Sequence, residues 1–276
     1  MTAYERLCAA RDQNRPTAIE YIRRMFGESF LELHGDRRYG DDKAVLAGIA
    51  SLNGMPLTVI ALEKGRNVKE RVARNFGSAH PEGYRKALRL MKQAEKFQRP
   101  VLCLIDTSGA YCGLGAEERG QGQAIAENLM EMMTLRTPVL ALLIGEGGSG
   151  GALALAVADQ VWMMENAVYS VISPEGCASI LWKDSSKVAD AAECLKLTSH
   201  DLYKMNVIEK IIREPKTADS GRLYESLGNL IYETFQEAKK LPVEQLLERR
   251  YQRFRKIWGG KLIPPFLLGY SSKICQ

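Results

Sequence analysis

The order of apolar and polar residues along the chain predicts alternating strands and helices. Two strand-like runs, residues 44–52 (AVLAGIASL) and 55–63 (MPLTVIALE), are joined at Asn53-Gly54, a dipeptide favoured in type I′ hairpin turns. Residues 101–105 and 139–144 are continuous apolar runs typical of buried parallel strands, each followed by a glycine-rich segment and a helical pattern. Repeated units of this kind predict an α/β fold with covered sheets.

Helical patterns fill most of the remaining chain. The opening residues predict one helix, and Pro16 precedes a second helix with apolar residues at Ile19, Ile22 and Phe26. Further helices are expected over residues 81–97 and 116–135 and from Pro174, and short strands at 161–164, 169–172 and 207–212. No linker or repeat divides the chain, so we expect one domain, residues 1–260. The tail, 261–276, lacks either period and is expected to be dispensable.

Composition narrows the class of protein. Of 276 residues, 46% are hydrophobic and 26% charged, which is typical of globular proteins. No apolar run approaches the ~20 residues of a membrane helix, and the first residues lack the apolar block of a signal peptide. We therefore expect a cytoplasmic protein without membrane association.

The net charge and the placement of cysteines and histidines argue against nucleic-acid-binding and metal-binding proteins. The net charge is only +5, and the basic run at residues 249–256 is typical of a solvated helix face, with docking to an acidic partner or a phosphorylated ligand as the second interpretation. Nothing else supports nucleic-acid binding. The six cysteines form no C-x-x-C pair and the three histidines are dispersed, so we expect no zinc ribbon and no metal site.

The most informative segment is the glycine-rich run 145–151 (GEGGSGG), between a strand and a helix. Glycines there leave backbone N–H groups uncovered, so the turn can donate hydrogen bonds to an anion. One interpretation is a dinucleotide site, because Gly145, Gly147 and Gly150 satisfy G-x-G-x-x-G and Glu165 follows the next strand. The short helix and the position of the motif in mid-chain argue against it.

A second interpretation is a serine hydrolase. Ser149 lies in G-x-S-x-G, and Asp184 or Asp190 and then His200 follow in the order of an α/β-hydrolase. However, His200 lies in SHDLYK, which reads as a helix start with Ser199 as its cap. Ser149 is also explained as a small residue that fits a tight turn.

A third interpretation is an oxyanion hole that needs no side-chain nucleophile. The segment 106–115 (DTSGAYCGLG) follows the preceding strand just as 145–151 follows the next one. Two neighbouring strand ends with glycine-rich loops would form one continuous binding rim. Because both segments are long and rich in glycine, we prefer this interpretation to two tight connections without function.

Several longer strings resemble one family. HPEGYRKALRLM (80–91), GAEERGQ (115–121), IGEGGSGGALA (144–154) and YSVISPEGCASILWK (169–183) are close to strings in the alpha subunit of bacterial acetyl-coenzyme A carboxylase carboxyltransferase, and RRYQR near the C-terminus agrees too. The similarity runs in the same order from about residue 15 to 256. It implies a crotonase-type spiral of β-β-α units with helical N- and C-terminal segments.

The resemblance also implies an activity and partners. Such subunits transfer CO2 from carboxybiotin to acetyl-coenzyme A, giving malonyl-coenzyme A for fatty acid biosynthesis. The carboxybiotin is held on a biotin carboxyl carrier protein, which biotin carboxylase carboxylates. Their partner is a beta subunit with a zinc ribbon, commonly in an α2β2 heterotetramer. Carried onto this chain, the amides of Gly150 and Gly151 would hold the ureido oxygen of biotin after CO2 is released, and the biotin enolate would then take a proton from the acetyl methyl group.

The same resemblance implies which residues surround carboxybiotin. The expected rim residues come from both glycine-rich segments and the helix start at Pro174: Gly109, Ala110, Tyr111, Gly113, Gly115, Gly147, Gly148, Glu175 and Gly176. This chain has Ser108 and Cys112 where family members commonly have prolines, so we expect a looser first loop. Its N-terminal helical extension is also short.

Two other functions stay open. A self-sufficient hydratase or decarboxylase of the same fold would need an acid or base, for which Glu117, Glu118 and Glu146 are candidates, although we favour a structural role for Glu146. A scaffold subunit would use the loops only to bind its partner. Coenzyme A phosphates could meet Lys64, Arg66 or Lys69, but a solvated helix start explains these residues better.

Overall fold

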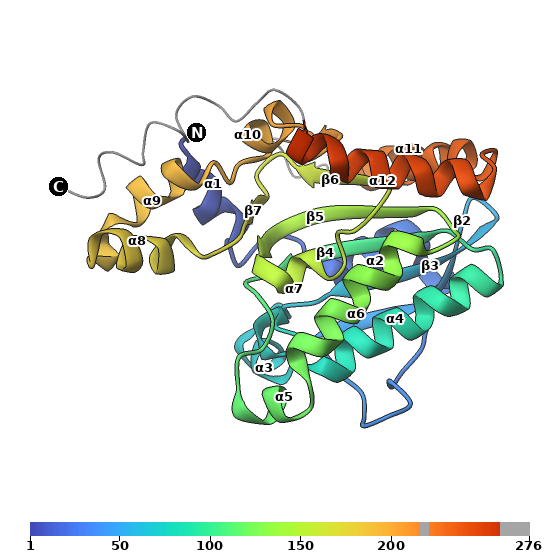
Figure 1. Cartoon of the computed structure of the whole chain (residues 1–276), viewed down its shortest axis with the longest axis horizontal. Coiled ribbons are helices and arrows are strands. Elements are labelled where there is room, and N and C mark those ends of the chain that lie inside the picture. Colours follow the sequence, from blue (N-terminus) through green and yellow to red (C-terminus); the bar gives the residue numbers. More distant parts are fainter. Residues whose placement is uncertain (216–220, 260–276) are drawn as a thin grey trace.

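The computed structural model describes residues 1–215 and 221–259, and a mixed β-sheet lies at its centre (Figure 1). Among the described residues, seven strands follow the order β1-β2-β3-β4-β5-β6-β8, and β7 pairs with β5 off this path. The strands are β1 Leu31–Glu32, β2 Val45–Leu52, β3 Met55–Leu62, β4 Val101–Thr107, β5 Val139–Gly148, β6 Gln160–Met164, β7 Val168–Ser170 and β8 Lys210–Ile212.

The first part of the sheet is antiparallel and the rest is parallel. β2 and β3 form the expected hairpin, in which Leu52 pairs with Met55 and both turn residues, Asn53 and Gly54, have positive φ (49° and 80°). This is the backbone of a type I′ turn, which asparagine and glycine adopt most readily. From β3 onward, β4, β5, β6 and β8 add in parallel, so their carboxyl ends meet at one side of the sheet.

β5 is the strand around which the sheet divides. Its first half pairs with β6, whereas its last residues, Glu146 to Gly148, pair with β7. The strand is therefore longer than the predicted run 139–144, because Gly145, Glu146, Gly147 and Gly148 continue it instead of forming a loop. Its end leads directly into α7, which packs against β4, β5 and α6.

Helices cover both faces of the sheet. In Figure 1, α4 and α6 lie together on the near face, α2 lies behind the strands, α11 and α12 run along the top, and α1, α8 and α9 gather beyond β7. Their bounds are α1 Ala3–Ala10, α2 Ala18–Phe26, α3 Val68–Ala73, α4 Pro81–Lys96, α5 Leu114–Glu118, α6 Gln121–Thr134, α7 Ser149–Leu153, α8 Pro174–Trp182, α9 Val188–Leu195, α10 Ser199–Lys204, α11 Gly221–Lys239 and α12 Val243–Gly259. Short 3-10 turns cover Gly27–Ser29, Asn75–Gly77 and Ser185–Lys187.

Two helix predictions need correction. The single helix expected over residues 116–135 is two helices, α5 and α6, separated at Gly120, whose left-handed φ of 82° interrupts the helical backbone. Thr198, and not Ser199, caps α10, because its hydroxyl accepts a hydrogen bond from the N–H of Asp201.

The basic run at residues 249–256 is only partly a solvated face. Arg250 is fully buried, and its guanidinium donates to the carbonyls of Met132, Leu135 and Thr137 and to the carboxylate of Asp159. These acceptors satisfy all the polar groups of the buried cation, as burial of a charge requires. The residue therefore anchors α12 to the beginning of β5.

The structure bears on membrane-spanning helices but not on the C-terminal tail. Within residues 1–215 and 221–259, no helix combines the length and the apolar character needed to cross a membrane. The tail, 261–276, lies outside the described residues, as does Gly260, so the expectation that it is dispensable stays a prediction.

Candidate active site

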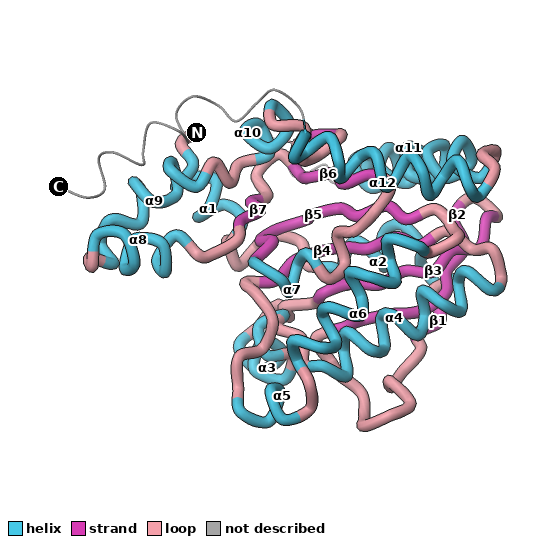
Figure 2. Tube along the Cα trace, in the orientation of Figure 1, coloured by secondary structure: helices cyan, strands magenta, loops and turns pink. Residues whose placement is uncertain are grey.

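The two glycine-rich segments lie against each other at the carboxyl ends of β4 and β5 (Figure 2). Thr107 at the end of β4 pairs with Gly147 of β5. A methyl group added at Gly148 would lie 2.1 Å from the carbonyl oxygen of Ser108, and one added at Gly151 would lie 2.4 Å from the backbone nitrogen of Ala110. Because carbon does not approach backbone that closely, both positions require glycine. The two segments form one rim, as expected.

Helix α7 presents backbone amides at this rim. It begins at Ser149, which is exposed and has a left-handed φ of 51°, and continues through Gly150 and Gly151. The first N–H groups of a helix have no acceptor within the helix. Gly150 is half-buried, and a methyl group there would meet only Ile125, at 3.8 Å. The arrangement suits hydrogen-bond donation to an oxygen atom outside the chain.

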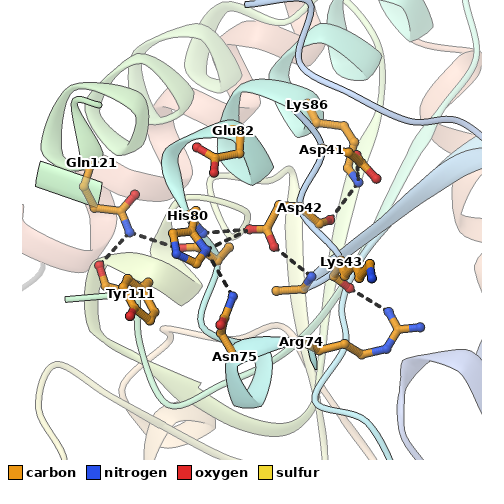
Figure 3. Close-up of polar contacts among 12 residues, drawn as sticks. Asp41, Asp42, Lys43, Arg74, Asn75, His80, Glu82, Lys86, Tyr111 and Gln121 are labelled. Atoms are coloured by element: carbon orange, nitrogen blue, oxygen red, sulfur yellow. Dashed lines mark hydrogen bonds and ion pairs between the residues drawn. The ribbon is translucent and has the colours of Figure 1, made fainter. Parts of the chain in front are cut away.

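The first loop is held in place by the side chain of Gln121, the backbone N–H of Tyr111 and the ring of His80. The amide nitrogen of the Gln121 side chain donates to the carbonyls of Ala79 (2.8 Å) and Tyr111 (2.9 Å), and the N–H of Tyr111 donates to the carbonyl of Ala79 (3.0 Å). The ring of His80 stacks on the ring of Tyr111, with centroids 4.1 Å apart, as Figure 3 shows. The loop that faces α7 is thereby fixed to α4 and α6.

A cluster of five charged side chains, buried at Asp106 and Glu146 and more exposed at Arg11 and Glu175, lies directly behind the rim. Lys64 binds Asp106 (2.6 Å) and approaches Glu146 (3.7 Å), and Arg11 binds both Glu146 and Glu175 (2.6 Å each). The N–H of Glu146 also donates to Asp106 (2.8 Å). The five side chains come from the end of α1, from β4, β5 and α8, and from the loop after β3, so the cluster ties these elements together behind the glycines.

The cluster decides several candidate roles. Glu146 is occupied by two cations, which supports a structural role. Hydrogen bonding to Arg11 lowers the pKa of Glu175, so this carboxyl stays ionised. Lys64 is mostly buried in ion pairs, so its interpretation as part of a solvated helix start is wrong. Arg66 pairs with Glu20 and is half exposed.

Two hollows flank the rim and differ in character. A charged one of about 200 Å³ lies over the charged cluster and is lined by Arg11, Arg15, Lys64, Arg71, Asp106 and Glu146 among others. A larger one of about 550 Å³ borders Ser149 and Gly150 and is mainly apolar; its walls include Leu153, Val171, Leu195, Leu202, Phe254 and Ile257. The exposed amides of α7 therefore adjoin an apolar surface suited to a ring system with one polar edge.

The other predicted rim residues divide into three groups, of which only the first meets at the rim. Gly109, Ala110 and Tyr111 lie in the first loop, and Gly147 and Gly148 end β5; these meet at the rim. Glu175 and Gly176 lie in the first turn of α8, and Glu175 reaches the rim only through Arg11. Gly113 and Gly115 lie at the start of α5, where their nearest neighbours are Tyr111 and Arg119 instead of α7.

The arrangement does not assemble a hydrolase triad. Ser149 borders the apolar hollow, whereas His200 lies on α10 and lines a different one beside Met1 and Thr2. The imidazole of His200 contacts the hydroxyl of Ser199, and Asp184 accepts from Ser186. The residues whose order in the sequence resembles a hydrolase triad therefore do not lie in one site.

The dinucleotide interpretation also fails on geometry. Gly145 and Gly147 belong to β5, where added methyl groups would strike Asp106 and Leu143, and α7 has only five residues. Glycine serves close packing here and not approach to a pyrophosphate.

Two acid or base candidates of the hydratase or decarboxylase alternative, Glu117 and Glu118, are exposed on α5.

Sequence reasoning missed two members of the site. Arg11 was assigned only to an opening helix, and Asp106 only to the beginning of a loop. The charge of each was visible, but their partners lie far away in the sequence: Arg11 meets Glu146 and Glu175, and Asp106 meets Lys64. The sequence did carry a signal for Asp106, because a carboxylate that directly follows an apolar strand commonly requires a partner.

Comparison with known proteins gives one consistent family. The family described as acetyl co-enzyme A carboxylase carboxyltransferase-like matches residues 1–258. A curated relative from Ruminiclostridium cellulolyticum, the acetyl-coenzyme A carboxylase carboxyl transferase subunit alpha, is 61% identical over 257 residues, which are 93% of this chain and 98% of the relative. The family match, residues 1–258, includes the rim and the cluster behind it.

Solved structures of lower identity share the fold. Transcarboxylase 12S superposes with a TM-score of 0.67 at 16% identity, covering 83% of this chain and 44% of that one. The beta subunit of geranyl-CoA carboxylase from P. aeruginosa gives a TM-score of 0.64 at 18% identity, covering 88% and 46%. These neighbours confirm the expected crotonase-type α/β fold. This chain spans less than half the length of either neighbour.

Proposed function

This chain belongs to the acetyl-coenzyme A carboxylase carboxyltransferase family, and we propose from that premise that the Gly150 and Gly151 amides form its oxyanion site. The chain is the alpha subunit of a carboxyltransferase that acts in the carboxylation of acetyl-coenzyme A, a reaction that leads to fatty acids. The family acts on coenzyme A thioesters and biotin-linked carboxyl donors. The observation that carries the assignment of the site is the contact between the two glycine-rich segments, which fixes the α7 amides beside an apolar hollow.

The residues at the rim fit the ureido edge of a biotin ring. Gly150 and Gly151 offer N–H groups, and an amide oxygen or its anion is an acceptor for such donors. The neighbouring wall, with Leu153 and Val171, is apolar and would pack against the ring carbons. Bound carboxybiotin would supply the carboxyl group of the reaction.

The contribution of the chain is to hold an oxygen on which negative charge develops. The backbone amides are preorganised because Gly151 packs against the first loop and Gly148 against Ser108. Loss of one such donor commonly costs ~3–4 kcal/mol of activation free energy. The proposed mechanism assigns no histidine or cysteine as a base at this site.

The chain acts together with a beta subunit. Its relative is named an alpha subunit, and the chains of the two structural neighbours are more than twice as long as the part that superposes. We extend the proposal to a zinc-ribbon beta subunit in an α2β2 assembly, to a biotin carboxyl carrier protein that delivers carboxybiotin, and to biotin carboxylase. The remaining rim residues, the single domain of residues 1–260 and a cytoplasmic location are part of the same proposal.

The test is an assay of the chain alone and with its beta partner. We expect the isolated chain to be inactive and the mixture to convert malonyl-coenzyme A and biotin to acetyl-coenzyme A and carboxybiotin, measured by release of acetyl-coenzyme A. A mixture that forms a complex without any turnover would support the scaffold interpretation. Full activity of the isolated chain would contradict the two-subunit proposal.

A further inference from the structure

Tyr84 carries a buried hydroxyl whose role the glycine-rich rim does not explain. The residue lies in the first turn of α4, and its side chain is fully buried. Its hydroxyl oxygen finds no hydrogen-bond partner among the described residues. Because the large majority of buried polar groups are hydrogen-bonded, and leaving one unpaired costs stability, such a hydroxyl calls for an explanation.

The hydroxyl lies where the two glycine-rich segments touch. A methyl group added at Gly151 would be 2.9 Å from the hydroxyl oxygen of Tyr84 and 2.4 Å from the backbone nitrogen of Ala110. The N–H of Ala110 donates to no acceptor within residues 1–215 and 221–259. Two donors, the phenol O–H of Tyr84 and the N–H of Ala110, therefore lie together beside Gly151.

No acceptor of the protein competes for the phenol proton. Burial raises the pKa of Tyr84, with the carboxylate of Asp42 as the second cause, so the hydroxyl keeps its proton at neutral pH. The oxygens of Asp42 accept from the N–H groups of His80 (2.7 Å) and Ala44 (2.9 Å) (Figure 3). The hydroxyl is a fixed donor in dry surroundings, where a hydrogen bond to charge is strongest.

We propose that the Tyr84 hydroxyl is a further donor of the oxyanion site, turning its proton toward the oxygen that the Gly150 and Gly151 amides hold. This inference rests on the proposed function of those amides. The hydroxyl gains its acceptor when charge develops on that oxygen, and charge-assisted hydrogen bonds are roughly twice as strong as neutral ones. Tyr84 thereby stabilises the charged state more than the ground state, which raises kcat more than it lowers KM.

The chain contains a matched control for this idea. Tyr224, on α11, is also buried and its hydroxyl also has no partner within the described residues. Its ring packs edge-on against Tyr21 of α2, with centroids 5.2 Å apart, and neither helix contributes to the rim. Removal of this hydroxyl repeats the chemical change of Tyr84→Phe at a place where no charge develops.

The experiment compares Tyr84→Phe and Tyr224→Phe in the complex with the beta subunit. In the malonyl-coenzyme A and biotin assay, we expect Tyr84→Phe to lower kcat by about 10- to 100-fold, as for a hydrogen bond to a charged group, with KM for biotin within about twofold. Tyr224→Phe should retain wild-type kcat. Both variants should melt about 2–4 °C higher, because each loses an unpaired buried hydroxyl.

The outcomes separate this inference from the proposed function. An inactive wild-type complex would reject the proposed function itself. An active wild type with unchanged kcat in Tyr84→Phe would overturn the role of the hydroxyl alone. A melting temperature that falls in Tyr84→Phe would also overturn it, since the hydroxyl would then have a partner in the unliganded protein.

Discussion

The two glycine-rich segments that follow β4 and β5 use the same residue type for different physical reasons. In the first loop, a methyl group at Gly109 would meet nothing within 4 Å, but the φ of 149° is one that other residues rarely adopt. In the second segment, methyl groups at Gly145, Gly147 and Gly148 would all come within 2.4 Å of another atom, although none of these glycines has positive φ. Gly109 is therefore needed for its backbone angle, whereas Gly145, Gly147 and Gly148 are needed for close contact.

The difference shows which segment tolerates change. The first loop is open toward solvent and is held by side-chain contacts from Gln121 and His80. In the second segment, a side chain added at Gly145, Gly147, Gly148 or Gly151 must displace a neighbouring residue. We therefore expect substitutions of glycines in the second segment to have the larger effects, except at Gly150, whose added methyl would meet only Ile125.

The largest effect is predicted for the neighbouring pair Gly150 and Gly151. Gly151→Ala places a methyl group against Ala110 and Gly109, which moves the first loop away from the α7 amides. We expect turnover in the complex to fall by about 10²–10³, the scale of a lost oxyanion donor. Gly150→Ala adds the same methyl group toward open space and should lower turnover less than tenfold.

A larger side chain at Gly151, as in Gly151→Val, would also strike the backbone of the first loop. Circular dichroism and complex formation must be unchanged in both alanine variants for the comparison to report on catalysis. Equal loss in the two variants would show that packing of the segments does not control the amides.

An intermediate effect is predicted for the charged cluster behind the second segment. Glu146→Gln keeps the shape of the side chain but weakens its contacts with Arg11 and Lys64, each of which retains another carboxylate. We expect a loss of about 1–2 kcal/mol in the free energy of unfolding, below the value for a fully broken buried pair because Arg11 is one-third exposed. Urea denaturation measures it, with Glu175→Gln as the more exposed control.

The same variant tests the hydratase or decarboxylase alternative. If Glu146 only holds Arg11 and Lys64, kcat should fall by less than tenfold. If it were a general acid or base, kcat should fall by about 10²–10⁴. A loss of that size at unchanged stability would favour the alternative reaction.

The parts of the fold that depend on local sequence were predictable. The Asn53-Gly54 turn follows from the backbone preferences of two residues, and the buried strands follow from continuous apolar runs. The contact between the two glycine-rich segments was also predictable, because the carboxyl ends of neighbouring parallel strands share one edge. These inferences need no knowledge of distant side chains.

The parts that depend on distant partners were not predictable. Arg250 was read as surface charge because its acceptors, such as Asp159, are brought to it only by the packing of α12 on the sheet. Arg11 and Glu146 are 135 positions apart and meet only in the folded chain. The extension of β5 through Gly148 was missed because glycine usually weakens a strand, and here its pairing with β7 outweighs that tendency.

The smallest effect is predicted at Ser149, which lies between the crowded and the open glycines. Its hydroxyl is exposed and its φ of 51° is left-handed, a conformation in which glycine is strained less than serine. Ser149→Gly should therefore raise the free energy of unfolding by about 0.5–1 kcal/mol, while Ser149→Ala should leave it nearly unchanged. Neither variant removes a backbone N–H group, so turnover in the complex should stay within about twofold of wild type. A serine nucleophile requires the opposite: Ser149→Ala would abolish turnover, and a serine-directed phosphonate would label the wild-type protein at this residue. Covalent labelling there would replace the oxyanion assignment with a hydrolase, whereas an unlabelled, active Ser149→Ala variant leaves the chemistry to the amides of its two neighbours.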